Sequence, residues 1–357
     1  MQHAHVAPAD AGAKWSGLQI LIVLLCFLIN MFDGVDVLIL TYVAPAVATD
    51  WNVSSANLGV VFSGGLAGMA FGGLLIAPLA DRYGRRRLIL LSLLLMTAGM
   101  IASSFSRTVS ELLLCRIVVG TGIGTVLAGM AAITAEYSPA RYRTFAVGFL
   151  QSGYPLGAVI TGFVAAWLLP QHGWRPLLLG SGLISLVLLP IVFFLMPESV
   201  AFLRRSGAPD ALERINALRT RMGQPALASL AALDAVASRT GDTESPPPLL
   251  STVLLWCAVF ASMMVLYFII SWIPKLAIEA GLDLTKGIYA GATYNIGAAL
   301  GIIALSLLSI RVRLQLLVPV FLTFAAVLMV VFGTVKMSVP AVLLIALLLG
   351  VGLQGGF

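Results

Sequence analysis

Long apolar runs separated by short polar segments divide almost the whole chain into elements of one kind. A run of about 20 predominantly apolar residues is long enough to cross the hydrocarbon core of a bilayer as an α-helix. The runs are continuous, whereas the strands of a transmembrane barrel alternate between apolar and polar positions. The pattern therefore predicts ten membrane-spanning helices, near residues 18–43, 58–80, 88–106, 112–135, 145–169, 175–196, 250–273, 288–309, 314–335 and 340–357.

The composition indicates the same class of protein. Hydrophobic residues make up 60% of the chain and charged residues 10%, whereas a typical soluble chain has about 45–50% apolar and roughly 25% charged residues. Such a chain has too few polar groups to cover its apolar surface, which excludes a soluble enzyme. The predicted fold class is an all-α polytopic membrane protein.

Several kinds of chemistry lack the residues they require. Cys26, Cys115 and Cys257 each stand alone in an apolar stretch, so they form neither a disulfide framework nor a metal site. The three histidines are too scattered for a zinc motif, and no phosphate-binding G-x-x-x-x-G-K-[ST] loop occurs. We therefore expect no metal, no cofactor and no enzymatic activity.

The positive charges are distributed unevenly between the predicted loops. With a cytoplasmic N-terminus, 15 of the 21 lysines and arginines fall in inner loops and five in outer loops, while Arg116 lies inside a span. This strong positive-inside signal predicts a multi-pass protein of the cell (inner) membrane with its N-terminus in the cytoplasm. Topology thus explains the net charge of +6, and no nucleic-acid partner is expected.

A polar, arginine-containing segment divides the spans into two groups. The predicted parts are a cytoplasmic tail at 1–17, a six-span half at 18–196, a cytoplasmic linker at 197–249 with a short amphipathic helix near 208–221, and a partial second half of four spans at 250–357. The last apolar run ends with the chain, which predicts a C-terminally incomplete second half without spans 11 and 12. On that expectation, residues 1–357 alone fold loosely in the second half and do not accumulate a substrate.

The loop after the second predicted span carries the most specific motif. Residues 77–87 read A-P-L-A-D-R-Y-G-R-R-R, which resembles the signature loop G-x-x-x-D-R-x-G-R-R of the major facilitator superfamily, with alanine for the first glycine. Glycine permits a tight turn between antiparallel helices, and the arginines anchor the turn at the anionic inner leaflet. A cluster that only stops membrane insertion would not explain the acid and the glycine at these offsets. The residues predicted to latch an inner gate are Asp81, Arg82, Gly84, Arg85 and Arg86.

The fourth predicted span contains an arginine. Residues 116–124 read R-I-V-V-G-T-G-I-G, which resembles R-x-x-x-G-x-G-x-G of the same superfamily. Arg116, Gly120 and Gly124 share one helix face, and the glycines allow a neighbouring helix to come close. Because a charge inside the membrane is costly, Arg116 is expected to face a cavity and bind substrate. The alternative is an arginine that extends to the outer interface.

The first predicted span carries a polar stripe. Asn30, Asp33 and Asp36 recur every three residues and therefore share one side of the helix. Two carboxylates within one turn repel each other in a low dielectric, so at least one is expected to bind a proton near neutral pH. Asp36 and Arg116 reach similar depths in antiparallel helices, which makes an ion pair geometrically possible. The alternative is that either aspartate is structural and bonded to the backbone.

Four elements together resemble the aromatic acid:proton symporter family of that superfamily. They are D-G-V-D at 33–36, E-Y-S-P-A-R-Y-R at 136–143, Y-F-I-I-S-W-I-P at 267–274 and Y-N-I-G-A at 294–298. Three features depart from the family pattern: valine separates the two aspartates, Asn295 stands where histidine or glutamine is common, and the second signature loop, at 305–313, lacks its acid and glycine. The resemblance implies transport roles for Asp33, Asp36, Arg116 and Glu136.

The resemblance implies proton-coupled uptake of small aromatic carboxylates, of the benzoate and hydroxybenzoate type, by alternating access. The partners would be the acid anion, protons and the lipid bilayer, and by analogy the protein is monomeric. Asp33 and Asp36 are predicted to couple protons, and Glu136 and Arg141 to join the inner gate. The residues predicted to bind substrate are Arg116, Asn30, Tyr154, Trp272, Tyr294 and Asn295.

The sequence leaves other functions open. The nearest is a major facilitator carrier for an aliphatic organic acid, or an exporter, and a transport-inactive fragment is a further alternative. A membrane aspartyl hydrolase is disfavoured, because its carboxylates converge from two helices whereas Asp33 and Asp36 lie on one.

Overall fold

The computed structural model describes residues 15–230, 249–264 (without 255, 258, 259 and 262), 284–334 and 339–355. Every regular element among these residues is a helix, which confirms the predicted all-α class. Trp272 and much of the predicted seventh span lie outside the described residues.

The first half contains six membrane-spanning stretches, and their helices are α1 (Gly17–Trp51), α2 (Ser55–Phe71), α3 (Ala80–Tyr83), α4 (Arg85–Phe105), α5 (Val109–Tyr137), α6 (Arg143–Gln151), α7 (Gly153–His172) and α8 (Arg175–Leu195). Two short helices follow, α9 (Val200–Arg205) and α10 (Ala211–Arg221), and α10 lies where the amphipathic linker helix is predicted. The described part of the second half includes α13 (Leu284–Leu308), α14 (Leu314–Thr334) and α15 (Val339–Gly355).

The helices agree with the predicted spans. Eight stretches of the described residues are long and apolar enough to cross a membrane, and they correspond to the first six, the eighth and the ninth predicted spans. The helix at the tenth predicted span, Pro340–Gly355, is apolar but shorter. The fifth predicted span is divided at Ser152, between α6 and α7.

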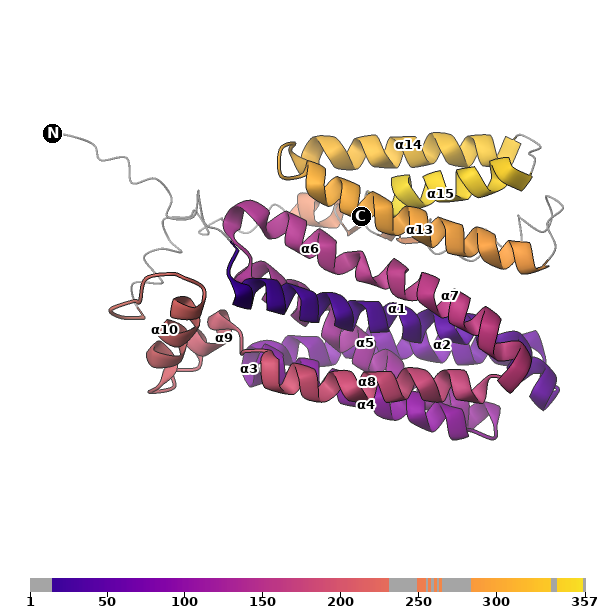
Figure 1. Ribbon diagram of the computed structural model, residues 1–357, viewed down its shortest axis with the longest axis horizontal. Helices are drawn as coiled ribbons and strands as arrows, with labels where there is room; N and C mark the ends of the chain where they lie inside the picture. The colour runs from indigo at the N-terminus through magenta and orange to yellow at the C-terminus, as the bar shows by residue number, and fades with distance from the viewer. Residues whose placement is uncertain are drawn as a thin grey trace.

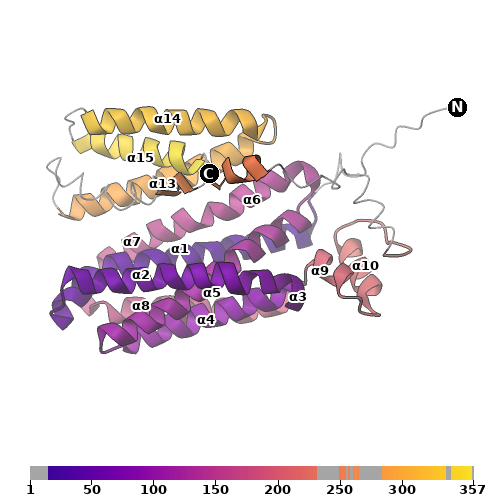
Figure 2. The same ribbon diagram turned by 180° about the vertical axis from the view of Figure 1, so that it is seen from behind.

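The two halves lie side by side. Figures 1 and 2 show α13, α14 and α15 together along one side of the first half. Among these three helices, α13 packs against the first half, through α6 and α7. Within the first half, α1 packs on α7 and α5, while α4 packs on α5 and α8. Side chains of α1, α6, α7 and α13 can therefore meet between the halves.

Glycines bring neighbouring helices into backbone contact in both halves. A Cβ atom on Gly120 or Gly124 of α5 would overlap a carbonyl oxygen of α2, and a Cβ atom on Gly297 or Gly301 of α13 would overlap a carbonyl oxygen of α15. Without side chains at these positions, helices can approach closely enough for extensive van der Waals contact. The second span thus packs on the fourth through glycine contacts of the same kind as those between the eighth and tenth spans, as expected of two repeated halves.

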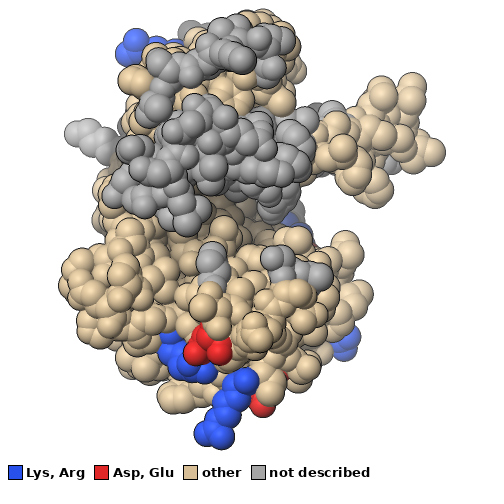
Figure 3. Space-filling model, turned by 90° about the vertical axis from the view of Figure 1, so that its right-hand side faces the viewer, with Lys and Arg blue, Asp and Glu red and all other residues tan. Residues whose placement is uncertain are grey.

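The two ends of the bundle differ in charge. Where α1 ends and α8 begins, Asp50 accepts hydrogen bonds from Trp174 (3.1 Å) and Arg175 (3.0 Å), and these contacts hold the pKa of the Asp50 carboxyl below its ordinary value. Figure 3 shows this end, where charged side chains of the described residues occupy a few places on a largely uncharged surface. At the opposite end, the arginine-containing helices α9 and α10 extend beyond the bundle beside α3 (Figures 1 and 2).

We expect Gly124→Ala to destabilise the protein, because the added Cβ would overlap the carbonyl oxygen of Met69 and lie 2.9 Å from the backbone nitrogen of Gly73. Overpacking of this kind typically costs about 1–3 kcal/mol, which is measurable as a lower thermal unfolding midpoint of the purified protein in detergent. Gly129→Ala is the matched control in the same helix, since its Cβ would only reach Ile89 at 3.5 Å. Equal midpoints for the two variants would contradict the close packing of α2 on α5.

Candidate functional site

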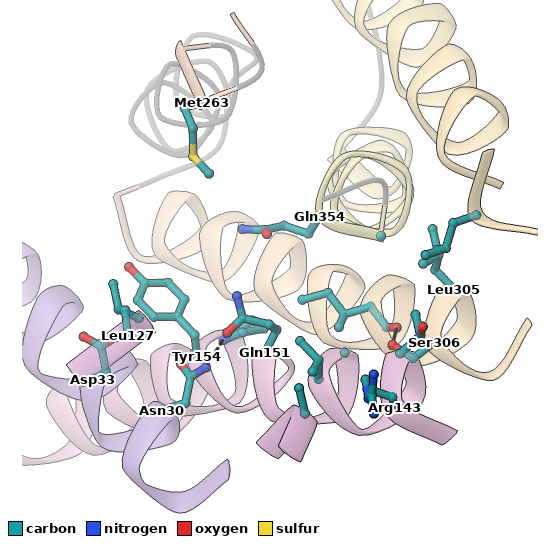
Figure 4. A pocket seen from close by; sticks show the side chains of 18 of the residues that line it. Asn30, Asp33, Leu127, Arg143, Gln151, Tyr154, Met263, Leu305, Ser306 and Gln354 are labelled. Atoms are coloured by element: carbon teal, nitrogen blue, oxygen red, sulfur yellow. Dashed lines mark hydrogen bonds between the residues drawn. The ribbon is translucent and has the colours of Figure 1, made fainter. Parts of the chain in front are cut away.

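A cavity of about 600 Å³ lies between the two halves. Residues of α1, α2, α5, α6, α7, α13, α14 and the end of α15 line it, and much of the surface is apolar (Figure 4). The volume falls in the range of about 300–1,000 Å³ that is typical of small-molecule sites. The polar side chains on the wall are Asn30, Asp33, Arg143, Thr144, Gln151, Tyr154, Ser306 and Gln354.

An asparagine of α1 contacts a glutamine at the end of α6, and an aspartate of α1 lies beside them on the cavity wall. The Asn30 amide donates a hydrogen bond to Gln151 Oε1 at 2.8 Å, so the Gln151 amide group remains a donor toward the cavity (Figure 4). Asp33 lies one turn further along α1, and its side chain is also on the cavity wall. Asp33 is 1% exposed, and its Oδ1 atom has no hydrogen-bond partner. A buried carboxylate oxygen without a partner is costly, which makes this atom a candidate for proton binding.

Glycine contacts between α1 and α7 hold Asp33 beside an aromatic ring. A Cβ atom on Gly34 would overlap the carbonyl oxygen of Tyr154, and one on Gly157 would overlap that of Met31. The two backbones therefore touch at the depth of Asp33. Figure 4 shows Tyr154 on α7 close to Asp33 of α1, at the same end of the cavity.

Asp36 belongs to a different environment from Asp33. Its Oδ1 atom accepts a hydrogen bond from Ser181 of α8 at 2.7 Å, its Oδ2 atom is buried without a partner, and it is not among the residues of the cavity wall. The polar stripe of α1 is therefore divided: Asn30 and Asp33 face the space between the halves, and Asp36 faces the interior of the first half.

Arg116 also lies inside the first half and not on the cavity wall. Its Nη2 atom donates to Ser103 Oγ at 2.8 Å and to the Met100 sulfur at 2.7 Å, and 3% of the residue is exposed. Arg116 and Asp36 interact electrostatically, but no carboxylate of the described residues lies within 4.0 Å of the guanidinium. Substrate binding by Arg116 stays a prediction that this position does not favour.

The signature loop is held by Glu198, which follows α8. Gly84 has a φ of 100°, a left-handed conformation that favours glycine, and its missing side chain leaves room for the Glu198 carboxylate, which would lie 2.5 Å from a Cβ atom there. The carboxylate accepts hydrogen bonds from the backbone N–H groups of Arg86 (3.0 Å) and Ser199 (2.9 Å). Tyr137 at the end of α5 donates to the Glu198 carbonyl oxygen at 2.6 Å.

A second set of contacts joins the same loop to α5 and α9. Arg85 forms an ion pair with Glu136, and Ser199 donates to the same carboxylate at 2.8 Å. Asp81 pairs with Arg205 at 3.3 Å but remains 62% exposed. Glu136, Arg85 and Asp81 thus form one charged network with the signature loop.

The other predicted gate residues lie at its edge. Arg82 stacks over the Tyr83 ring and Arg141 over the Tyr142 ring, each at 5.6 Å from the ring centroid, and both arginines are exposed. Their gating roles stay predictions.

Two of the predicted substrate residues of the second half, Tyr294 and Asn295, lie on α13 away from the cavity wall. Tyr294 is buried in the apolar cluster formed by α13, α14 and α15, and the Asn295 amide donates to the Gly291 carbonyl oxygen of its own helix at 3.0 Å. Neither residue is on the cavity wall, so their roles stay predictions. Trp272 lies outside the described residues.

The sequence pattern did not single out Gln151, Ser181, Ser103 or Glu198, and it included Arg143 in the family element at 136–143 without giving it a role. The signal for Gln151 was present, because an amide three residues before Tyr154 shares its helix face. Glu198 also carried a signal, as an acid directly after a long apolar span. Nothing in the local pattern shows that Glu198 bonds to a loop 112 residues away.

Comparison with known proteins agrees with this architecture. The chain belongs to the Major Facilitator Superfamily, whose family model matches residues 25–357. It is similar to the gallate transporter of Pseudomonas putida, with 34% identity over 292 residues that cover 80% of this chain and 64% of that protein. It is also similar to the 4-hydroxybenzoate transporter PcaK of Pseudomonas aeruginosa, with 33% identity over 344 residues that cover 94% of this chain and 76% of that protein.

Among solved structures, the chain resembles the proton:xylose symporter XylE bound to 6-bromo-6-deoxy-D-glucose. The TM-score is 0.76 at 18% identity, and the match covers 95% of this chain and 80% of that chain. The inward-open form of XylE from E. coli gives a TM-score of 0.64, also at 18% identity, over 95% of this chain and 80% of that chain. These likenesses show the fold. The protein is therefore a multi-pass membrane transport protein of the major facilitator fold, and not an enzyme.

We expect Glu198→Ala to destabilise the inner network, because two backbone N–H groups lose their carboxylate acceptor. Hydrogen bonds to charged groups contribute about 1.5–3 kcal/mol, so the thermal unfolding midpoint should fall clearly. Glu213→Ala is the control, since Glu213 is an exposed carboxylate of α10. A midpoint as high as that of the control would mean that Glu198 does not hold the loop.

Proposed function

We propose that the protein is a secondary transporter that couples the uptake of small aromatic carboxylates to protons by alternating access. The observation that carries the proposal is Asp33, a buried carboxylate on the wall of the cavity between the halves. Ionisable residues inside a membrane protein commonly mark pathways for ions or protons. A proton on Asp33 also removes the negative charge that would repel an anionic substrate in the same cavity.

This shared cavity supplies a physical mechanism for coupling. With Asp33 ionised, an incoming carboxylate meets a like charge at low dielectric, and with Asp33 protonated it does not. Proton binding therefore strengthens anion binding, and anion binding strengthens proton binding by the same factor. We propose that Asp36, held by Ser181 and influenced by Arg116, assists from inside the first half. In this proposal, Arg116 acts through Asp36 and not by touching substrate.

The substrate class rests on the relatives and on the lining of the cavity. The similar proteins include transporters named for gallate, 4-hydroxybenzoate and benzoate. Tyr154 offers an aromatic face, and the Asn30–Gln151 pair offers amide groups that can bond to ring hydroxyls. A second candidate is a carrier of aliphatic organic anions, because the cis,cis-muconate transport protein of Acinetobacter baylyi is 31% identical over 187 residues, 52% of this chain.

Further parts of the proposal concern topology and gating. We place the protein in the inner membrane as a monomer, with the N-terminus cytoplasmic, because the arginines of the signature loop, α9 and α10 gather at one end of the bundle. In that orientation the network around Gly84 lies at the inner gate. The proposed gate residues are Asp81, Arg82, Gly84, Arg85, Arg86, Glu136 and Arg141.

The function is tested with purified protein in two assays. Titration measures equilibrium binding of 4-hydroxybenzoate and of an aliphatic dicarboxylate such as muconate, and proteoliposomes with an imposed proton gradient measure uptake. Preferential binding and gradient-driven accumulation of the aromatic acid support the proposal. Preferential binding and uptake of the aliphatic acid support the second candidate. Accumulation of the acid only when the direction of the imposed proton gradient is reversed supports an exporter. Binding without accumulation supports a transport-inactive chain.

We expect Asp33→Asn and Asp36→Asn each to abolish gradient-driven accumulation. Only Asp33→Asn should also remove the pH dependence of equilibrium binding. In the wild type, affinity for the anion should fall as the pH rises, because Asp33 loses its proton and repels the substrate. An amide at position 33 stays neutral at every pH, so binding should become constant over the range in which the substrate is ionised.

The control for this pair is Asp210→Asn, which changes an exposed carboxylate near α10 that pairs with Arg214 at 3.7 Å. It should leave both uptake and the pH dependence unchanged. An undiminished pH dependence in Asp33→Asn would show that the coupling group lies elsewhere.

A further inference from the structure

The cavity wall carries one cation besides its acid. Two of the described residues that line the cavity have side chains of a type that is charged in water at neutral pH, namely Asp33 and Arg143. Arg143 is exposed, and no carboxylate of the described residues lies within 4.0 Å of its guanidinium. Figure 4 places its side chain across from Ser306 of α13. A cation that faces a cavity with no counter-ion among the described residues is suited to bind an anion there.

The surroundings of Arg143 add hydrogen-bond donors. Arg143 is the first residue of α6, a helix whose N-terminus has no side-chain cap. The N–H group of Arg143 itself already donates to the Ala140 carbonyl oxygen, and the Ser306 hydroxyl donates to the Ile302 carbonyl oxygen at 2.6 Å. Thr144, the next residue of α6, also lines the cavity. The donors that this region adds to the cavity are therefore the Arg143 guanidinium and the Thr144 hydroxyl.

A second donor lies on the same helix face at the other end of α6. Arg143, Val147 and Gln151 are spaced at i, i+4 and i+8, and all three line the cavity. Eight residues of α-helix span about 12 Å along the axis. Because Gln151 Oε1 accepts from Asn30, its amide N–H groups are free to donate to a ligand. The wall thus has an anion site and a neutral donor at its two ends.

Two other arginines, Arg116 and Arg141, do not line the cavity and so are not placed to bind an anion in it. Arg116 is buried in the first half and bonded to Ser103 and Met100. Arg141, two residues before Arg143, stacks over the Tyr142 ring and does not line the cavity.

We propose that Arg143 binds the carboxylate of the transported acid in the cavity, while Gln151 donates a hydrogen bond to a polar group at the far end of the same molecule. The planar guanidinium can hold both carboxylate oxygens at once. This proposal rests on the proposed function in assuming that the cavity takes small carboxylates. It assigns substrate recognition to α6 and leaves Asp33 as the group that binds the proton.

The test is equilibrium binding of 4-hydroxybenzoate to the purified full chain, measured by calorimetric titration for three substitutions. Arg143→Met keeps most of the length without the charge, and it should weaken binding by about tenfold or more, as expected for loss of a charged hydrogen-bond partner. Arg143→Lys keeps the charge and should lose less than Arg143→Met. Arg214→Met is the control, since Arg214 is an exposed arginine of α10 that does not line the cavity, and it should bind as the wild type does. Thermal unfolding midpoints establish that each variant is folded.

Gln151→Leu tests the proposed contact with the polar group at the far end of the ligand independently of the carboxylate contact. It should weaken 4-hydroxybenzoate more than benzoate, because benzoate lacks the ring hydroxyl. Arg143→Met should weaken both acids to a similar extent, since both carry the carboxylate.

The outcomes distinguish this inference from the proposed function. If the wild type binds the aromatic acid and Arg143→Met binds it equally well, the inference is overturned and the proposed function stands. An equal loss in Arg214→Met would also overturn it, as an effect of surface charge alone. If the wild type prefers muconate and Arg143→Met loses that binding, the anion site stands and the aromatic substrate class fails. Binding of no carboxylate by the wild type would overturn both.

Discussion

Keeping a carboxylate in the middle of a membrane bundle is the constraint on which the arrangement of this protein depends. An ionised carboxylate away from water is costly unless it is paired, hydrogen-bonded or protonated. Asp33 is buried with one oxygen unpartnered, yet it lies on the wall of a cavity between the halves. Its charge is therefore sensitive to what occupies the cavity. Asp36, three residues later, has instead a fixed partner in Ser181.

The frame around Asp33 is held by backbone contacts rather than by large side chains. Gly34 and Gly157 bring α1 and α7 together at this depth, and Gly124 does the same for α5 and α2. Such contacts leave little freedom within a half. Among the described helices, α13 meets α6 and α7 between the halves, while Glu198 and Glu136 hold the signature loop within the first half through hydrogen bonds and an ion pair. Two well-packed halves that meet along a few helices suit the rocking mechanism that we propose.

The sequence predicted the class, most spans and the polar stripe, because length, hydropathy and the helical period are local properties. It did not predict how the stripe divides. Asp33 and Asp36 differ by about 60° around the helix axis, and only the packing of α7 and α8 decides that one faces the cavity and the other Ser181. Arg116 was predicted to bind substrate because it lies within an apolar span, whereas the sequence places Arg143 among the arginines of an inner loop. Its place on the cavity wall depends on where α13 lies, which no local pattern contains.

Joined together, the two proposals give a reason why proton and anion should move as a pair. Arg143 supplies a positive charge, while the charge of Asp33 depends on its proton. The empty cavity with Asp33 ionised carries one positive and one negative group, so it is neutral overall. The cavity that holds both a proton and a carboxylate is neutral as well. With the proton alone it has one net positive charge, and with the anion alone one net negative charge. Closing a cavity around a net charge in the low dielectric of the membrane costs more than closing it around none. The two neutral states therefore pass through an occluded form at lower cost than the two charged states, which favours transport of proton and anion together.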